Sequence, residues 1–184
     1  MNRLRANRIY LCGAMDRVKD GGIGWRNEIG GWLRTRGVIV LDPCNKPIDI
    51  GIEDAENRQL RHQLKQAGDY YAVARDMKII RCVDLRMVDL SDALIVNLDV
   101  EVHACGTYEE LFLANREKKP VIIHVEQGKQ SVPDWILGTV PHEMIFSTWP
   151  EVHDYLHRVD SSPDVDHMKR WMFFHYDVPL ESVY

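Results

Sequence analysis

The chain has 184 residues, a length that favours one domain and suffices to bury a core without disulfide or metal support. Its 23 basic and 28 acidic residues give a net charge of −5. Without a clustered excess of positive charge, DNA and RNA are disfavoured as partners, whereas free nucleosides and nucleotides are not.

Other features of the composition predict a cytoplasmic protein. The apolar runs are only a few residues long, so no segment is expected to span a membrane. The apolar stretch near the N-terminus is about five residues, too short for a signal peptide. Cys12, Cys44, Cys82 and Cys105 lie far apart, with no C-x-x-C pair to bind zinc, which favours reduced thiols.

Short apolar runs alternate with segments of helical periodicity along residues 1–160, the predicted α/β domain. The predicted strands are Arg8–Gly13, Val38–Leu41, Ala93–Leu98, Pro120–Val125 and Glu143–Phe146. The predicted helices are Trp25–Arg36, Glu53–Gln66, Tyr70–Leu90, Thr107–Glu117 and Trp149–Val159. This alternation is typical of an α/β protein with about five parallel strands and helices on both faces of the sheet.

A parallel sheet of this kind binds ligands beyond the carboxyl ends of its strands. The segments expected there are Gly13–Arg26, Asp42–Asn45, Leu98–Glu110 and Glu126–Gly138. Residues 161–184 differ in composition, opening as a polar linker and becoming aromatic. Since disordered tails lack aromatic residues, we expect this tail to dock on the body or on a neighbouring subunit.

The strongest local signal is Cys105-Gly106-Thr107-Tyr108-Glu109-Glu110, which follows the third predicted strand. Gly106 would let the backbone approach a ligand closely, and Thr107 is able to cap the following helix. Glu110 would lie on the first turn, where an ionised carboxylate can attack an electrophilic sugar carbon. The spacing fits equally a capping box made by Thr107 and Glu110, while Glu109 is interpreted as surface charge.

The motifs occur in an order that resembles the nucleoside 2-deoxyribosyltransferase family and its N-glycosidase relatives. They are Ile9-Tyr10-Leu11-Cys12-Gly13-Ala14-Met15, Trp25-Arg26, Asp84, Asp89, Ser91-Asp92-Ala93, the Gly106–Leu111 turn, Ala114 and Lys119-Pro120-Val121-Ile122. The resemblance covers roughly residues 8–125 and implies a flavodoxin-like α/β sandwich. It also implies cleavage of the N-glycosidic bond of a 2′-deoxynucleoside, without a cofactor, and transfer of the sugar to another base.

In that family a glutamate after a G-x-x-x-E turn forms a covalent deoxyribosyl intermediate, and Glu110 matches its position. The resemblance assigns contact with the leaving base to Asp84, which would otherwise be a surface residue near Arg81 and Arg86. The remaining candidates for substrate contact are Gly13, Met15, Asp16, Trp25, His103, Gly106, Thr107 and the terminal Tyr184.

Several of these candidates have an alternative interpretation. Asp16 fits an Asx turn, Trp25 fits the core, His103 fits a structural role, and Tyr184 fits an exposed chain end. In several transferases of the family that the chain resembles, the carboxylate of a terminal tyrosine helps to bind the 5′-hydroxyl of the sugar. No metal site is expected, because the histidines are scattered and the i, i+4 pair His153 and His157 lacks a third ligand.

Ala104 departs from the family pattern. Two residues before the loop glycine, transferases often carry an aspartate and monophosphate hydrolases a serine. The alternatives are therefore a nucleoside 5′-monophosphate N-glycosidase and a catalytically silent nucleotide-binding protein on the same fold. The aromatic tail and the resemblance also predict a homo-oligomer. The preferred base and the biological pathway do not follow from the sequence.

Overall fold

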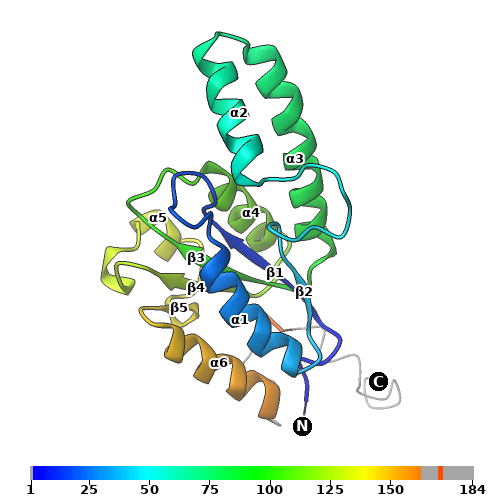
Figure 1. Cartoon of the computed structure of the whole chain (residues 1–184). Coiled ribbons are helices and arrows are strands. Elements are labelled where there is room, and N and C mark those ends of the chain that lie inside the picture. Colours follow the sequence, from blue (N-terminus) through cyan, green and yellow to red (C-terminus); the bar gives the residue numbers. More distant parts are fainter. Residues whose placement is uncertain (1, 163–169, 172–184) are drawn as a thin grey trace.

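A parallel sheet of five strands forms the centre of the protein in the computed structural model, which describes residues 2–162, 170 and 171 (Figure 1). The strands are β1 (Arg8–Gly13), β2 (Ile39–Leu41), β3 (Ala93–Leu98), β4 (Val121–Val125) and β5 (Ile145–Phe146). Their order is β2-β1-β3-β4-β5, and every neighbouring pair is parallel. The prediction of a doubly wound, flavodoxin-like α/β fold is confirmed.

The three middle strands are almost wholly apolar because both faces of the sheet are covered. All residues of β3 and β4 are buried, and Leu11, Ile95 and Ile122 lie side by side in register across β1, β3 and β4. This uninterrupted apolar centre leaves the carboxyl ends of the strands as the place for polar side chains.

Six helices accompany the sheet in the part of the chain described. They are α1 (Ile23–Thr35), α2 (Ala55–Gln66), α3 (Tyr70–Leu90), α4 (Cys105–Arg116), α5 (Asp134–Leu137) and α6 (Trp149–Ser161). Helices α1 and α6 run side by side (Figure 1), with the rings of Trp32 and His153 4.7 Å apart. Helices α3 and α4 pack against each other near β1 and β3, and an ion pair between Arg81 and Glu109 joins them.

The predicted and observed elements differ mainly at their ends. Helix α4 begins at Cys105, two residues before the predicted start, and the four-residue helix α5 was not predicted. Two 3₁₀ turns, Lys129–Ser131 and His142–Met144, were also missed. These short elements offer too few residues for a periodic pattern to be visible in the sequence.

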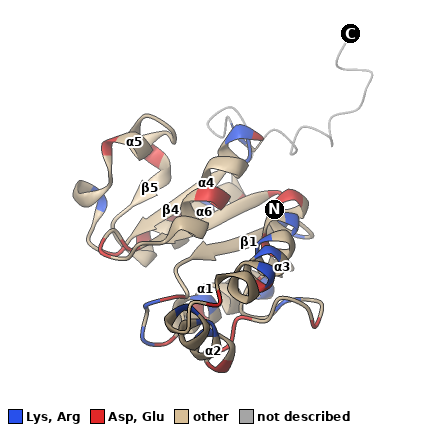
Figure 2. Cartoon of the chain, turned by 90° about the horizontal axis from the view of Figure 1, so that it is seen from above, with Lys and Arg blue, Asp and Glu red and all other residues tan. Residues whose placement is uncertain are grey.

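Helices α2 and α3 form a hairpin that projects beyond the body (Figure 1). Side chains of Asp54 and Asp69 cap their first turns by accepting hydrogen bonds from backbone amides. The exposed tip carries Tyr70 and Tyr71, whereas the buried residues of α3 lie in its second half and include Asp84. In the view of Figure 2, acidic and basic residues are mixed over the molecule rather than divided into two faces.

Two described residues of the segment 161–184 contact the body. Trp171 is buried and donates a hydrogen bond from Nε1 to the Tyr155 hydroxyl at 2.9 Å, and Arg170 donates to Asn115 Oδ1 at 2.7 Å. Most of that segment, including Tyr184, lies outside the described residues. Within the described ranges, no helix has both the length and the apolar character needed to cross a membrane.

Candidate active site

A cavity of about 440 Å³ opens at the carboxyl ends of β1, β2 and β3, the edge at which the sequence predicted a ligand site. The β1–α1 loop, the segment after β2, the second half of α3 and the start of α4 form its walls. Its lining residues include Tyr10, Gly13, Ala14, Met15, Asp16, Arg17, Pro43, Glu53, Ile80, Asp84, Leu85, His103, Ala104, Gly106, Thr107 and Glu110.

The α4 wall presents the carboxyl group of Glu110. Its Oε1 accepts a hydrogen bond from the Tyr10 hydroxyl of β1 at 3.0 Å. Burial raises the pKa of Glu110, while hydrogen bonds from Cys12 and Tyr10 oppose that rise. Burial, followed by the Glu110 charge, raises the pKa of Tyr10 well above its usual value, so its hydroxyl remains protonated and donates to the carboxylate.

The capping-box interpretation of Glu110 is wrong. Because α4 begins at Cys105, Thr107 lies inside the helix and is buried, and the N-cap residue is Ala104, which makes no side-chain cap. Glu110 is therefore not engaged in closing the helix, and its carboxyl group faces the cavity. Glu109 is exposed and paired with Arg81, as the surface-charge interpretation expects.

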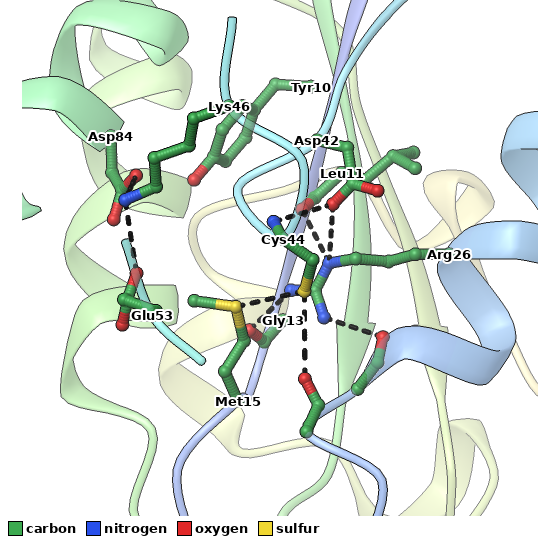
Figure 3. A network of polar contacts seen from close by, with 12 residues as sticks. Tyr10, Leu11, Gly13, Met15, Arg26, Asp42, Cys44, Lys46, Glu53 and Asp84 are labelled. Atoms are coloured by element: carbon green, nitrogen blue, oxygen red, sulfur yellow. Dashed lines mark hydrogen bonds and ion pairs between the residues drawn. The ribbon is translucent and has the colours of Figure 1, made fainter. Parts of the chain in front are cut away.

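The opposite set of polar groups gathers around Lys46, which follows β2. Its Nζ lies 2.7 Å from Asp84 Oδ1 on α3 and 3.3 Å from Glu53 Oε1. Figure 3 shows the three side chains pointing toward one another. The Lys46 side chain is only 3% exposed. Asp84 is buried and bound by this ammonium group, so the interpretation of Asp84 as a surface residue near Arg81 and Arg86 is wrong.

The carboxyl groups on this wall have raised pKa values, which favours their protonated forms. Burial raises the pKa of Asp84, and the hydrogen bond and charge of Lys46 oppose that rise. Burial, then the charge of Asp84, raises the pKa of Glu53 from 4.5 to about 7 against the effect of Lys46. The cavity therefore contains carboxyl groups in contrasting environments, which is how one site comes to provide both an acid and a nucleophile.

A buried arginine fixes the loop edge of the cavity. Arg26 donates from Nε to the Leu11 carbonyl, from Nη1 to Gly22 and from Nη2 to Gly13, and its Nε lies 3.7 Å from Asp42 Oδ1 (Figure 3). Gly13 is required here, because a Cβ would come within 2.8 Å of the Trp25 ring and 3.0 Å of the Asn97 carbonyl. This framework joins the ends of β1 and β2 to the start of α1.

Most of the other predicted contact residues also line the cavity. Gly13, Met15, Asp16, His103, Gly106 and Thr107 do so, and a Cβ on Gly106 would meet no atom within 4 Å. Trp25 lies elsewhere. Its ring stacks on Trp149 with centroids 5.5 Å apart, and it borders a smaller cavity of about 250 Å³ instead. The interpretation of Trp25 as a packing residue therefore describes its position better than the stacking face for a base.

Sequence reasoning missed Lys46 and Glu53 as site residues and treated Tyr10 only as part of a strand motif. Lys46 follows the expected segment Asp42–Asn45 by one residue, so its position carried a usable signal. Glu53 carried none, because it lies eleven residues beyond Asp42 and was assigned to a charged helix. Among the residues described, no three His, Cys, Asp or Glu side chains are placed to hold a metal ion, and His153 packs edge-on against Trp32.

Fold and cavity together define a flavodoxin-like α/β protein with a carboxylate-lined pocket of small-molecule size. No protein-family model and no curated protein sequence matches the chain. Among solved structures, nineteen chains match, one of them a 2-deoxyribosyltransferase from the psychrotolerant bacterium Bacillus psychrosaccharolyticus. That structure superimposes with a TM-score of 0.55 and 17% identity, over 80% of this chain and 91% of its own length. The similarity establishes the shared fold.

Proposed function

We propose that this protein cleaves the N-glycosidic bond of a 2′-deoxynucleoside and transfers the deoxyribosyl group to another base. The observation that carries the proposal is Glu110, a carboxyl group on the first turns of α4 that faces the cavity, bound by a neutral hydroxyl from Tyr10. The resemblance of the ordered motifs to nucleoside 2-deoxyribosyltransferases and the similarity in fold to one of them support it.

In this mechanism the Glu110 carboxylate attacks C1′ of the sugar as the bond to the base breaks. The product is a glycosyl ester on Glu110, which the nitrogen of an incoming base then attacks. Asp84, on the α3 wall, contacts the base. Two carboxyl groups in one cavity, one bound by a neutral hydroxyl and the other by an ammonium group, fit a retaining displacement, in which one group is the nucleophile and another supplies the proton.

Arg17 favours one alternative, hydrolysis of a nucleoside 5′-monophosphate. It is exposed at the cavity lining and offers a cation for a phosphate group. Against it, Ala104 provides no hydroxyl for that phosphate, and Asp16, adjacent to Arg17, brings a negative charge to the same loop.

Incubation of the protein with a 2′-deoxynucleoside, with and without a second free base, tests the proposal. A new nucleoside that contains the second base supports transfer, and intact-mass analysis should show a deoxyribosyl adduct that a peptide map places on Glu110. Free deoxyribose without exchange, or faster reaction of the 5′-monophosphate, would favour the hydrolase. Binding without turnover would identify a silent nucleotide-binding protein.

A further inference from the structure

The segment between β2 and α2 places two charged side chains beside the cavity that the mechanism above does not use. Lys46 and Glu53 belong to this segment, and Glu53 lines the same cavity as Glu110 and Asp84. Glu53 is partly buried, with 12% of its side chain exposed, and Lys46 Nζ lies 3.3 Å from its Oε1.

The charges around Glu53 show where a proton is held. Lys46 and Cys44 come from its own segment, Asp84 from α3 and Glu110 from α4. Arg58 of α2 is bonded to the Glu53 carbonyl oxygen at 2.7 Å rather than to its carboxyl group. Glu53 and Asp84 thus share Lys46 as their close ammonium partner, and the Glu110 charge acts on the same group of carboxyl side chains, so the simultaneous ionisation of all three is unfavourable at low local dielectric.

The position of Lys46 decides which carboxyl group stays ionised. Its Nζ is 2.7 Å from Asp84 but 3.3 Å from Glu53, so the ammonium charge favours the carboxylate form of Asp84 more strongly. The proton therefore resides on Glu53, in agreement with the rise of its pKa to about 7. Asp84 is left as an acceptor and Glu53 as a donor on the same wall.

We propose that Glu53 is the proton carrier for the base in this reaction and that Lys46 is the positioning residue that assigns it this role. The inference rests on the proposed function and names the group that performs its acid–base step. It differs from the expectation drawn from the sequence, in which Asp84 handled the base alone.

The step balances as follows. The Glu110 carboxylate oxygen forms a bond to C1′, the C1′–N bond breaks, and its electron pair remains on the base nitrogen. The Glu53 carboxylic acid transfers its proton to the base, which leaves neutral, and Glu53 becomes a carboxylate. In the second half, the incoming base loses its N–H proton to Glu53 as its nitrogen attacks C1′, and Glu110 is released as a carboxylate.

The two halves are coupled through charge. In the free enzyme the negative charge of Glu110 favours retention of the proton on Glu53, because like charges raise each other's pKa. The ester on Glu110 is neutral, so this repulsion disappears when C1′ is attacked, and Glu53 becomes a better acid at that moment. When Glu110 is regenerated, the repulsion returns and Glu53 again retains the proton.

The test compares substrates whose bases differ in their need for a proton. The base of 7-methyl-2′-deoxyguanosine is cationic in the nucleoside and leaves neutral without protonation, whereas adenine and cytosine leave poorly as anions. Wild-type protein, Glu53→Gln, Lys46→Met and the control Glu56→Gln are assayed with 2′-deoxyadenosine, 2′-deoxycytidine and the methylated nucleoside. Glu56 is exposed in the first turn of α2 and serves as the matched control.

In single-turnover reactions without an acceptor base, Glu53→Gln should lower the rate of base release from ordinary deoxynucleosides by about 10²-fold or more, and from the methylated one by less than about threefold. Wild-type activity on ordinary deoxynucleosides should fall as the pH rises above about 7, and this limb should be absent in Glu53→Gln. Lys46→Met should shift the pH at which this alkaline fall in activity occurs, and Glu56→Gln should resemble wild type.

Two results would overturn the assignment. Equal losses on both classes of substrate, or an unchanged alkaline limb in Glu53→Gln, would reject the proton-carrier role and leave the transferase proposal intact. The absence of turnover of all three substrates by wild-type protein would overturn both. Circular dichroism of each variant identifies unfolding. If Glu53→Gln is unfolded, the pH dependence of wild-type activity on the two classes of substrate decides whether a proton carrier acts on the base.

Discussion

The two polar walls of the cavity are built in different ways. On the α4 wall, Glu110 has a neutral partner, the Tyr10 hydroxyl at 3.0 Å. On the α3 wall, Asp84 and Glu53 have a charged partner, Lys46, whose side chain is almost fully buried. A neutral donor leaves a carboxylate available for attack, whereas a cation divides the proton unequally between the two carboxyl groups that it touches.

In the proposed mechanism, this difference separates two functions that one carboxyl group cannot perform at the same time. A nucleophile has to be ionised and an acid has to be protonated at the same pH. The contrast leads to predictions in which each variant changes the polar groups of one wall and leaves those of the other wall in place.

Removal of the proposed nucleophile, Glu110, should have the largest effect. Glu110→Gln should lower turnover by about 10⁴-fold or more, since loss of a nucleophile abolishes the covalent route. Substrate binding and folding should be largely retained, and the deoxyribosyl adduct should disappear from the mass spectrum.

The neighbouring Glu109→Gln is the control, because Glu109 has the same charge but is exposed and bound by Arg81. It should change turnover only slightly. Substantial activity in a clean preparation of Glu110→Gln would reject the assignment of the nucleophile.

The next effect concerns the charge balance of the α3 wall. Asp84→Asn removes the carboxylate that raises the pKa of Glu53, so Lys46 would pair with an ionised Glu53. Activity at pH 7.5 should fall by about 10²-fold and recover in part at pH 5.5, where Glu53 regains its proton.

The measurement is the pH dependence of kcat, with Asp89→Asn as the control. Asp89 lies on the same helix but is exposed and only 3.9 Å from Arg86. A loss that is the same at every pH would show that Asp84 acts independently of Glu53.

The two walls also differ in how much of them could be read from the sequence. The α4 wall follows from local order, because a buried strand, a glycine turn and a helix place Glu110 at the edge of the sheet. The α3 wall depends on contacts between segments far apart in the chain. Lys46 and Asp84 are separated by 38 positions, and only the folded chain shows that they meet. Periodicity identified α3 at its observed bounds but gave no sign that Asp84 was buried.

The helix start was misjudged for a related reason. The sequence favoured Thr107 as a cap because threonine is a good N-cap residue. In the structure Thr107 packs inside the helix, where its carbonyl accepts a contact from the buried Cys12 thiol at 3.5 Å. Tertiary packing against β1 thus outweighed the local capping preference.

A third prediction measures the proton on Glu53 through stability. Its pKa is raised from 4.5 to about 7 in the folded state, so the folded protein binds the proton more tightly than the unfolded chain. The associated stability is fully present below about pH 4.5 and is lost as the pH rises through about 7. The difference corresponds to roughly 3 kcal/mol of unfolding free energy.

Glu53→Gln cannot ionise and should therefore lose less stability than wild type between pH 5 and pH 8. Urea unfolding at both values measures the change, with Glu56→Gln as the control. Parallel loss in wild type and Glu53→Gln would show that Glu53 is not the group that carries the extra proton.

The smallest expected effect comes from the neutral partner on the α4 wall. Tyr10→Phe removes the hydroxyl that donates to Glu110, and a hydrogen bond to a charged group is worth about 1.5–3 kcal/mol. That hydrogen bond lowers the pKa of Glu110 against the effect of burial, so its loss should raise the pKa further.

Because the proposed reaction needs Glu110 ionised, the acidic limb of kcat/KM in Tyr10→Phe should move to higher pH. The difference between the variant and wild type should be largest at acidic pH and should narrow as the pH rises. Tyr108 lies on α4, the helix of Glu110, but its ring stacks on Phe112. Tyr108→Phe should therefore leave the acidic limb of kcat/KM in place. If Tyr10→Phe instead lowered activity equally at all pH values, Tyr10 would act on the substrate and not on the ionisation of Glu110.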